Sequence, residues 1–178
     1  MTTTKRLKRL ALMLFTSEIS KEEKQAALGV VNDLDAAISD IEKLISKIQK
    51  NIDLFATYTG KPESLLSIKS NFEKSIDKHK DSYEQILYKI RTAFKNMDSF
   101  KDIKLQDDVL LTAQEGEIFT DLFNEYLEIS RTIGKPEFLE EFKNKCNEII
   151  QRSQNFSDVI QSCVKHINKN ILEKQPIS

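Results

Sequence analysis

The chain has 178 residues, of which 31% are charged and 39% hydrophobic, and its formal net charge is −1. A nearly neutral chain lacks the overall attraction to phosphate that basic domains show, so we expect no nucleic-acid partner. Only 4 Gly and 3 Pro interrupt the sequence, a composition typical of long helices joined by short turns. The length suffices for one domain with a substantial core.

Residues 1–16 form a basic amphipathic segment, in which four cations precede an apolar run and no acidic residue occurs before Glu18. The run is shorter than the ~20 residues that span a bilayer. One interpretation is a short helix that docks on the rest of the protein through Leu7, Leu10, Ala11 and Leu14. The alternatives are an organelle-targeting peptide, or contact with an anionic membrane surface or an acidic partner. The residues assigned to that contact are Lys5, Arg6, Lys8, Arg9, Leu10, Leu14 and Phe15.

The first long helix is expected to begin after Ser20, because Ser20 and Glu23 have the spacing of a capping box. Its apolar residues recur with alternating steps of three and four, which is typical of a helix with a continuous seam. The seam is Val31, Leu34, Ile38, Ile41, Ile45, Ile48, Ile52 and Phe55. Val30, Ala37 and Leu44 widen this face, so the helix needs at least two neighbours. We expect it to end at Gly60, and a close helix crossing is one reason for Gly29 within it.

A second helix is predicted from Pro62 to Met97, with His79 in its apolar seam. A histidine at that position is either a hydrogen-bonded core residue or a pH-sensitive or ligand-binding group. Residues 98–108 have no clean period and are predicted to form a connection. Asp107 or Asp108 would then cap the third helix.

The third helix is predicted from Val109 to Ile133, with two adjacent apolar stripes. One is Ile118, Leu122, Tyr126, Ile129 and Ile133, taken as the seam, and the other is Phe119, Phe123 and Leu127. Residues 107–128 contain seven acidic residues and no Lys or Arg. The second stripe either receives the N-terminal segment or forms a docking groove for a partner helix. In the docking hypothesis Phe119, Phe123 and Leu127 are anchors, and Asp121, Glu125 and Glu128 set the charge preference.

A fourth helix is predicted from Pro136 to about residue 173, and it carries both cysteines. Cys146 and Cys163 are 17 residues apart, which is about 25 Å along a helix. A disulfide needs Cα atoms within about 7 Å, so these two thiols cannot pair in that helix. We interpret them as reduced core thiols of a cytoplasmic protein.

The tetrapeptide Gly60-Lys-Pro-Glu63 recurs as Gly134-Lys-Pro-Glu137, between the first two and the last two helices. This echo predicts two αα-hairpins, which an internal duplication would explain. The expected fold is all-α, an antiparallel four-helix bundle of two αα-hairpins with a short N-terminal amphipathic helix. We divide the chain into the segment 1–16 and a single bundle domain, 17–178.

The sequence shows no catalytic motif. Neither His79 nor His166 has a Glu three residues before it, the cysteines lack zinc spacing, and no glycine-rich phosphate loop is present. We therefore expect no enzyme, no metal and no cofactor. The leading hypothesis is a non-catalytic protein–protein interaction module: an adaptor, an assembly subunit, or a chaperone-type or immunity-type binder. The alternative is a peripheral membrane protein anchored by residues 5–15. The partner is another protein, and homo-oligomers are left open.

Overall fold

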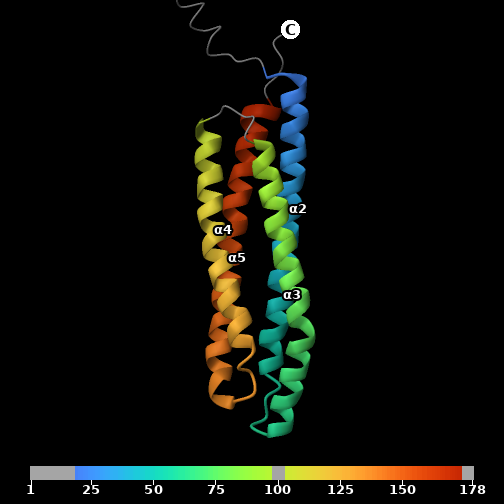
Figure 1. Ribbon diagram of the computed structural model, residues 1–178, viewed down its shortest axis with the longest axis vertical. Helices are drawn as coiled ribbons and strands as arrows, with labels where there is room; N and C mark the ends of the chain where they lie inside the picture. The colour runs from blue at the N-terminus through green and yellow to red at the C-terminus, as the bar shows by residue number, and fades with distance from the viewer. Residues whose placement is uncertain (1–18, 98–102, 174–178) are drawn as a thin grey trace, which may run out of the picture.

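The computed structural model describes residues 19–97 and 103–173, which form four long antiparallel helices (Figure 1). A 3-10 turn precedes the last helix and a π-helical turn follows it. The helices are α2 (Lys21–Phe55), α3 (Pro62–Met97), α4 (Ile103–Ser130) and α5 (Leu139–Ile167), and the two turns are Pro136–Phe138 and Asn168–Leu172. The predicted all-α four-helix bundle is confirmed, and α3 has the predicted bounds.

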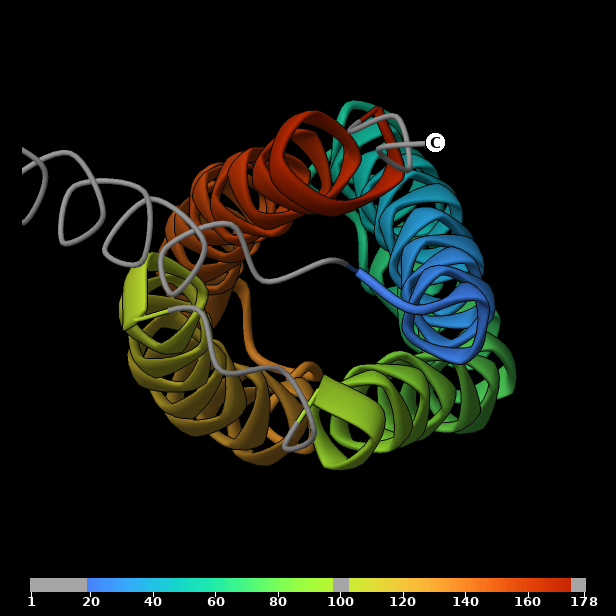
Figure 2. The same ribbon diagram turned by 90° about the horizontal axis from the view of Figure 1, so that it is seen from above.

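Viewed along the bundle axis, the helices form a ring in the order α2, α3, α4, α5 (Figure 2). Three of the four neighbouring pairs pack extensively: α2 with α3, α4 with α5, and α2 with α5. The pair α3 and α4 has by far the least extensive contact of the four. The two αα-hairpins are therefore joined mainly through α2 and α5, and the opposite side of the bundle is held less tightly.

The wide apolar face of α2 lies in the core, as its sequence predicts. Val30, Leu34, Ala37, Ile41 and Leu44 are fully buried, so both the seam and its flanking stripe face neighbouring helices. Toward the end of α2, Ile48 is also fully buried, whereas Ile45, Ile52 and Phe55 are only partly buried. Full burial of one aliphatic side chain contributes about 1.5–3 kcal/mol, which makes this face a main source of stability.

The start of α2 is the predicted capping box. The Glu23 backbone N–H donates to Ser20 Oγ at 3.0 Å, and the Ser20 N–H donates to Glu23 Oε2 at 2.8 Å. The prediction of a close helix crossing at Gly29 is wrong, because a Cβ there would have no neighbour within 4 Å. The helix ends at Phe55, five residues before Gly60.

The predicted start of the third helix is wrong. Residues 98–108 were expected to be a connection, but α4 already begins at Ile103, so Asp107 and Asp108 lie inside the helix and do not cap it. Asp108 faces α5, where its Oδ2 lies 3.0 Å from Nδ1 of His166. A carboxylate on an inward-facing position obscures the apolar period, because its partner belongs to another helix. The helix ends at Ser130, before the predicted Ile133.

The inward face of α4 is wider than the predicted seam but excludes its first residue. Leu122, Tyr126 and Ile133 of that seam are buried as predicted. Phe119, Phe123 and Tyr126 are fully buried, whereas Ile118, the first residue of the predicted seam, is 37% exposed. The aromatic rings turn inward because they pack on one another and on Tyr83 of α3. The predicted seam at Ile118 is therefore wrong.

The two turns that share the tetrapeptide differ in geometry. Gly60 adopts a φ of +78°, in the left-handed region, and is the only described residue with positive φ. Pro62 is the first residue of α3, whereas Pro136 opens the 3-10 turn before α5. The shared sequence thus marks the turn in both hairpins without fixing one backbone path, and duplication stays a prediction.

Candidate functional site

Aromatic side chains join α3, as far along as Tyr83, to the C-terminal half of α4. The Tyr83 ring on α3 stacks on Phe123 of α4, with centroids 4.4 Å apart and planes at 7°, and lies 5.5 Å from Phe119. Further down, the Tyr126 ring of α4 is 5.8 Å from the ring of Phe72. These contacts hold the two helices together at this level of the bundle.

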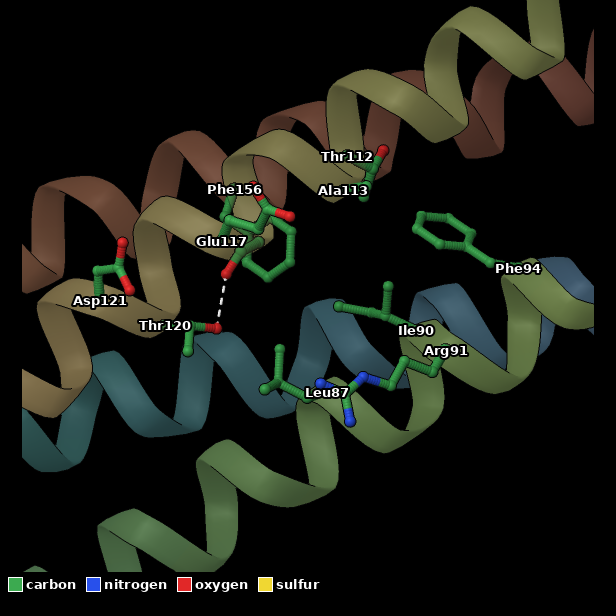
Figure 3. A pocket seen from close by; sticks show the side chains of 11 residues that line it. Leu87, Ile90, Arg91, Phe94, Thr112, Ala113, Glu117, Thr120, Asp121 and Phe156 are labelled. Carbon is green, nitrogen blue, oxygen red and sulfur yellow. Dashed lines mark hydrogen bonds between the residues drawn. The ribbon is translucent and has the colours of Figure 1, made fainter.

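Above Tyr83 the two helices are separated by a groove with a volume of about 430 Å³ (Figure 3). Most of its lining is apolar or small, and the Phe156 ring of α5 lies behind the space between α3 and α4. The α3 wall is Leu87, Ile90, Arg91 and Phe94, and the α4 wall is Thr112, Ala113, Gly116, Glu117, Thr120 and Asp121.

The groove is open because the α4 wall has short side chains. Ala113, Gly116 and Thr120 follow one another along the side of α4 that faces α3. The Thr120 hydroxyl donates to the Gly116 carbonyl at 2.7 Å, so its polar group is satisfied within its own helix. A Cβ on Gly116 would lie 3.4 Å from the Phe156 ring, which already occupies the space behind the helix. Between the charged residues at its edges, the groove therefore presents a largely apolar surface.

The rim of the groove carries opposite charges on its two sides. Glu117 and Asp121 are exposed on the α4 side, and Arg91 is exposed on the α3 side. Within residues 19–97 and 103–173, no salt bridge engages any of these three side chains. The charges are thus available to select the orientation of whatever lies in the groove.

The predicted aromatic anchors are not at the surface. Phe119 and Phe123 are fully buried in the core, so the prediction that they contact a partner directly is wrong. Leu127 is partly buried against the same core. Leu122 and Tyr126 of the adjacent stripe are buried as well, so both apolar stripes of α4 contribute to the core.

The predicted acidic residues divide between two surroundings. Asp121 borders the groove, whereas Glu125 accepts a hydrogen bond from Lys145 of α5 at 2.7 Å. Glu128 is exposed beyond the groove. Glu115 also faces α5, where it lies 3.4 Å from Arg152. Glu115 and Glu125 are therefore each paired with a cation of α5.

The residues predicted to contact a membrane or an acidic partner, in the segment 5–15, lie outside the described residues. No helix within residues 19–97 and 103–173 has the length and hydrophobicity needed to cross a membrane. Membrane association thus stays a prediction that rests on the sequence alone.

His79 is a core residue, as one interpretation of the sequence predicted. It is 2% exposed, and its Nδ1 lies 2.8 Å from the Tyr126 hydroxyl, which also accepts a hydrogen bond from Asn51 Nδ2 at 3.3 Å. Burial, and then the charge of Lys47, lower the pKa of His79 to about 4. Burial also raises the pKa of Tyr126 well above its ordinary range. The cluster is therefore neutral and closed to solvent, which suits a structural role.

The two cysteines are free thiols buried in the core. Burial raises the pKa of Cys163 to about 12 and that of Cys146 still further, so both stay protonated at neutral pH. In the described part of the chain, no group of three His, Cys, Asp or Glu side chains is arranged to hold a metal ion.

The groove was not predicted from the sequence. The available signal was the run of small residues on α4, Ala113, Gly116 and Thr120, opposite Leu87 and Phe94 of α3. Periodicity does not distinguish a small residue that allows close packing from one that leaves a gap.

The chain matches no protein-family model, no curated protein and no solved structure.

Proposed function

We propose that the protein is a non-catalytic interaction module that binds an amphipathic helix of a partner protein in the groove between α3 and α4. The observation that carries this proposal is the separation of α3 from α4 above Tyr83, which leaves an apolar groove on an otherwise closely packed bundle. An adaptor, an assembly subunit or a chaperone-type binder would use such a groove in the same way.

The dimensions of the groove suit a short stretch of helix. Its α3 wall extends from Leu87 to Phe94. Seven residues cover about 10 Å of helix, so roughly two turns of a bound helix would contact the groove. Apolar residues of that helix at positions i, i+3, i+4 and i+7 would face Leu87, Phe94 and Ala113.

The rim charges give the bound helix a preferred orientation. A basic flank would face Glu117 and Asp121, and an acidic flank would face Arg91. Exposed charges at the edge of an interface add modest affinity but increase the association rate and select the partner. The apolar contacts would supply most of the binding energy.

Three side chains of types that often take part in chemistry are closed to solvent, which favours a binding role. His79, Cys146 and Cys163 are all buried and stay uncharged at neutral pH. The two free thiols also favour a reducing compartment such as the cytoplasm, and we include this localisation in the proposal.

Filling the groove tests the proposal. Full-length protein is first used as bait to identify a native partner, and its affinity for that partner is measured by calorimetry. Ala113→Trp places a large ring in the groove and should weaken binding at least ten-fold. The matched control is Gln114→Trp, which adds a Trp at the neighbouring exposed position that does not line the groove.

Circular dichroism melting shows whether both variants fold. The control should bind within two-fold of the unmodified protein. Equal affinity of both folded variants for the partner would exclude the groove as the binding site.

A further inference from the structure

We propose that residues 5–11 of this same chain occupy the groove between α3 and α4 within one molecule, and that a partner helix must displace them. The internal occupant goes beyond the proposed function, whereas its displacement by a partner helix rests on that function. It depends on the charges of the rim, on the chemistry of the segment, and on the distance that the chain must cover.

The chemistry of the segment complements the groove. Leu7, Leu10 and Ala11 are spaced i, i+3, i+4, so a helix would present them on one side to the apolar walls. The residues around them are cations, and no acid precedes Glu18. On the α4 rim, Glu117 and Asp121 have no salt-bridge partner among the described residues. The segment supplies the positive charge that this rim lacks.

The connecting chain is long enough. Asn51 Nδ2 lies 3.3 Å from Ser75 Oγ, which sets the register of α2 against α3. At 1.5 Å per residue from that contact, Ser20 lies about 18 Å beyond Phe94, at the upper end of the groove. Crossing one helix adds about 10 Å sideways, which gives a straight path of about 21 Å. Residues 12–18 span about 24 Å when extended, so they reach the groove.

Because the two rims carry opposite charges, charge reversals on them should change docking of the segment in opposite directions. Arg91 repels the cations on the other flank of the segment, so the docked state is a balance between attraction to α4 and repulsion from α3. Reversing the charge of Arg91 should therefore strengthen docking, and reversing Glu117 and Asp121 should weaken it. General destabilisation of the bundle would not produce effects of opposite sign.

Disulfide trapping in the full-length chain tests the proposal. The variant Leu10→Cys with Ala113→Cys places one thiol on the segment and one in the groove. The control, Leu10→Cys with Leu111→Cys, moves the second thiol by about 200° around the same helix. Cys146 and Cys163 are buried and do not compete. In a glutathione redox buffer, the Ala113 pair should form an intramolecular disulfide with an effective concentration at least ten-fold higher than the control pair.

Charge variants of the Ala113 pair then test the rim. Glu117→Lys with Asp121→Lys should lower the effective concentration at least three-fold, and Arg91→Glu should raise it. Asp107→Lys, an exposed site on α4 outside the groove, should leave it unchanged. An effective concentration that is the same in all of these charge variants would overturn the proposal.

Two other outcomes also overturn it. A disulfide between chains, with a yield that rises with protein concentration, would assign the groove to the segment of a second copy. Equal trapping at both sites, combined with co-sedimentation of the full chain with phosphatidylserine vesicles, would assign the segment to a membrane surface. Neither of these outcomes decides whether Ala113→Trp weakens binding of a partner. Conversely, unchanged partner binding by Ala113→Trp does not decide whether the disulfide forms, so each proposal can be rejected independently of the other.

Discussion

The hydroxyl of Tyr126 on α4 lies 2.8 Å from Nδ1 of His79 on α3. Asn51 donates to the same hydroxyl oxygen, and in the neutral tautomer that leaves Nδ1 unprotonated, the imidazole accepts the phenolic proton. This contact joins three helices through their side chains at one level of the core. It also makes the stability of the bundle depend on the protonation state of a single histidine.

Stability should therefore fall in acid. The pKa of His79 is lowered from 6.5 to about 4 on folding. Between these two pH values, His79 therefore binds a proton in the unfolded chain but not in the folded chain. This group's contribution is complete above pH 6.5 and declines as the pH falls toward 4, by about 3 kcal/mol in total. The free energy of unfolding is measured in urea at pH 7 and at pH 4.5. Its decrease between these two pH values should be about 2 kcal/mol smaller in His79→Gln than in the unmodified protein. An identical pH dependence in both proteins would contradict this assignment.

Removing the Tyr126 hydroxyl should lower the free energy of unfolding. Tyr126→Phe deletes the acceptor of the Asn51 hydrogen bond and the donor to His79, and both groups remain buried without that partner. We expect a loss of about 1–3 kcal/mol in the free energy of unfolding. Tyr88 is 72% exposed, so Tyr88→Phe makes the same atomic change at the surface and should cost less than about 0.5 kcal/mol. Equal losses at the two positions would mean that the buried hydrogen bonds are not formed.

The orientation of α4 can be tested with two neighbouring residues. Phe119 is fully buried against Phe156 and Tyr83, so Phe119→Ala should lower the free energy of unfolding by about 3–5 kcal/mol. Ile118 is 37% exposed, and Ile118→Ala should cost less than about 1 kcal/mol. Chemical denaturation of both variants measures the difference. A larger loss at Ile118 would restore the seam expected from the sequence.

The same substitution at two glycines should have opposite effects. Gly29 lies inside α2 with nothing near a new Cβ, so Gly29→Ala should stabilise the protein by about 1 kcal/mol through helix propensity. Gly60 has a φ of +78°, where a side chain is strained, and Gly60→Ala should destabilise by about 1 kcal/mol. Urea midpoints of the two variants check both signs. Stabilisation by both substitutions would mean that the turn does not hold the left-handed conformation.

Local patterns predicted the helices wherever apolar spacing was regular. The bounds of α3 and the capping box at Ser20 follow from side chains a few residues apart, so the sequence contains all the information that they need. The prediction of where α4 begins was wrong because Asp108 interrupts the apolar period. Its partner, His166, is distant in sequence, and nothing local indicates that the pair exists.

The sequence by itself determined the class of fold, because a face of α2 this apolar can be buried only among several helices of the same kind. It did not determine where the edge of the buried face of α4 lies, since Ile118 and Phe119 are both apolar and differ by only about 100° around the helix. Tertiary packing made that choice by stacking Phe123 on Tyr83. The same packing left the groove between α3 and the small residues Ala113, Gly116 and Thr120 of α4, on which both proposals depend.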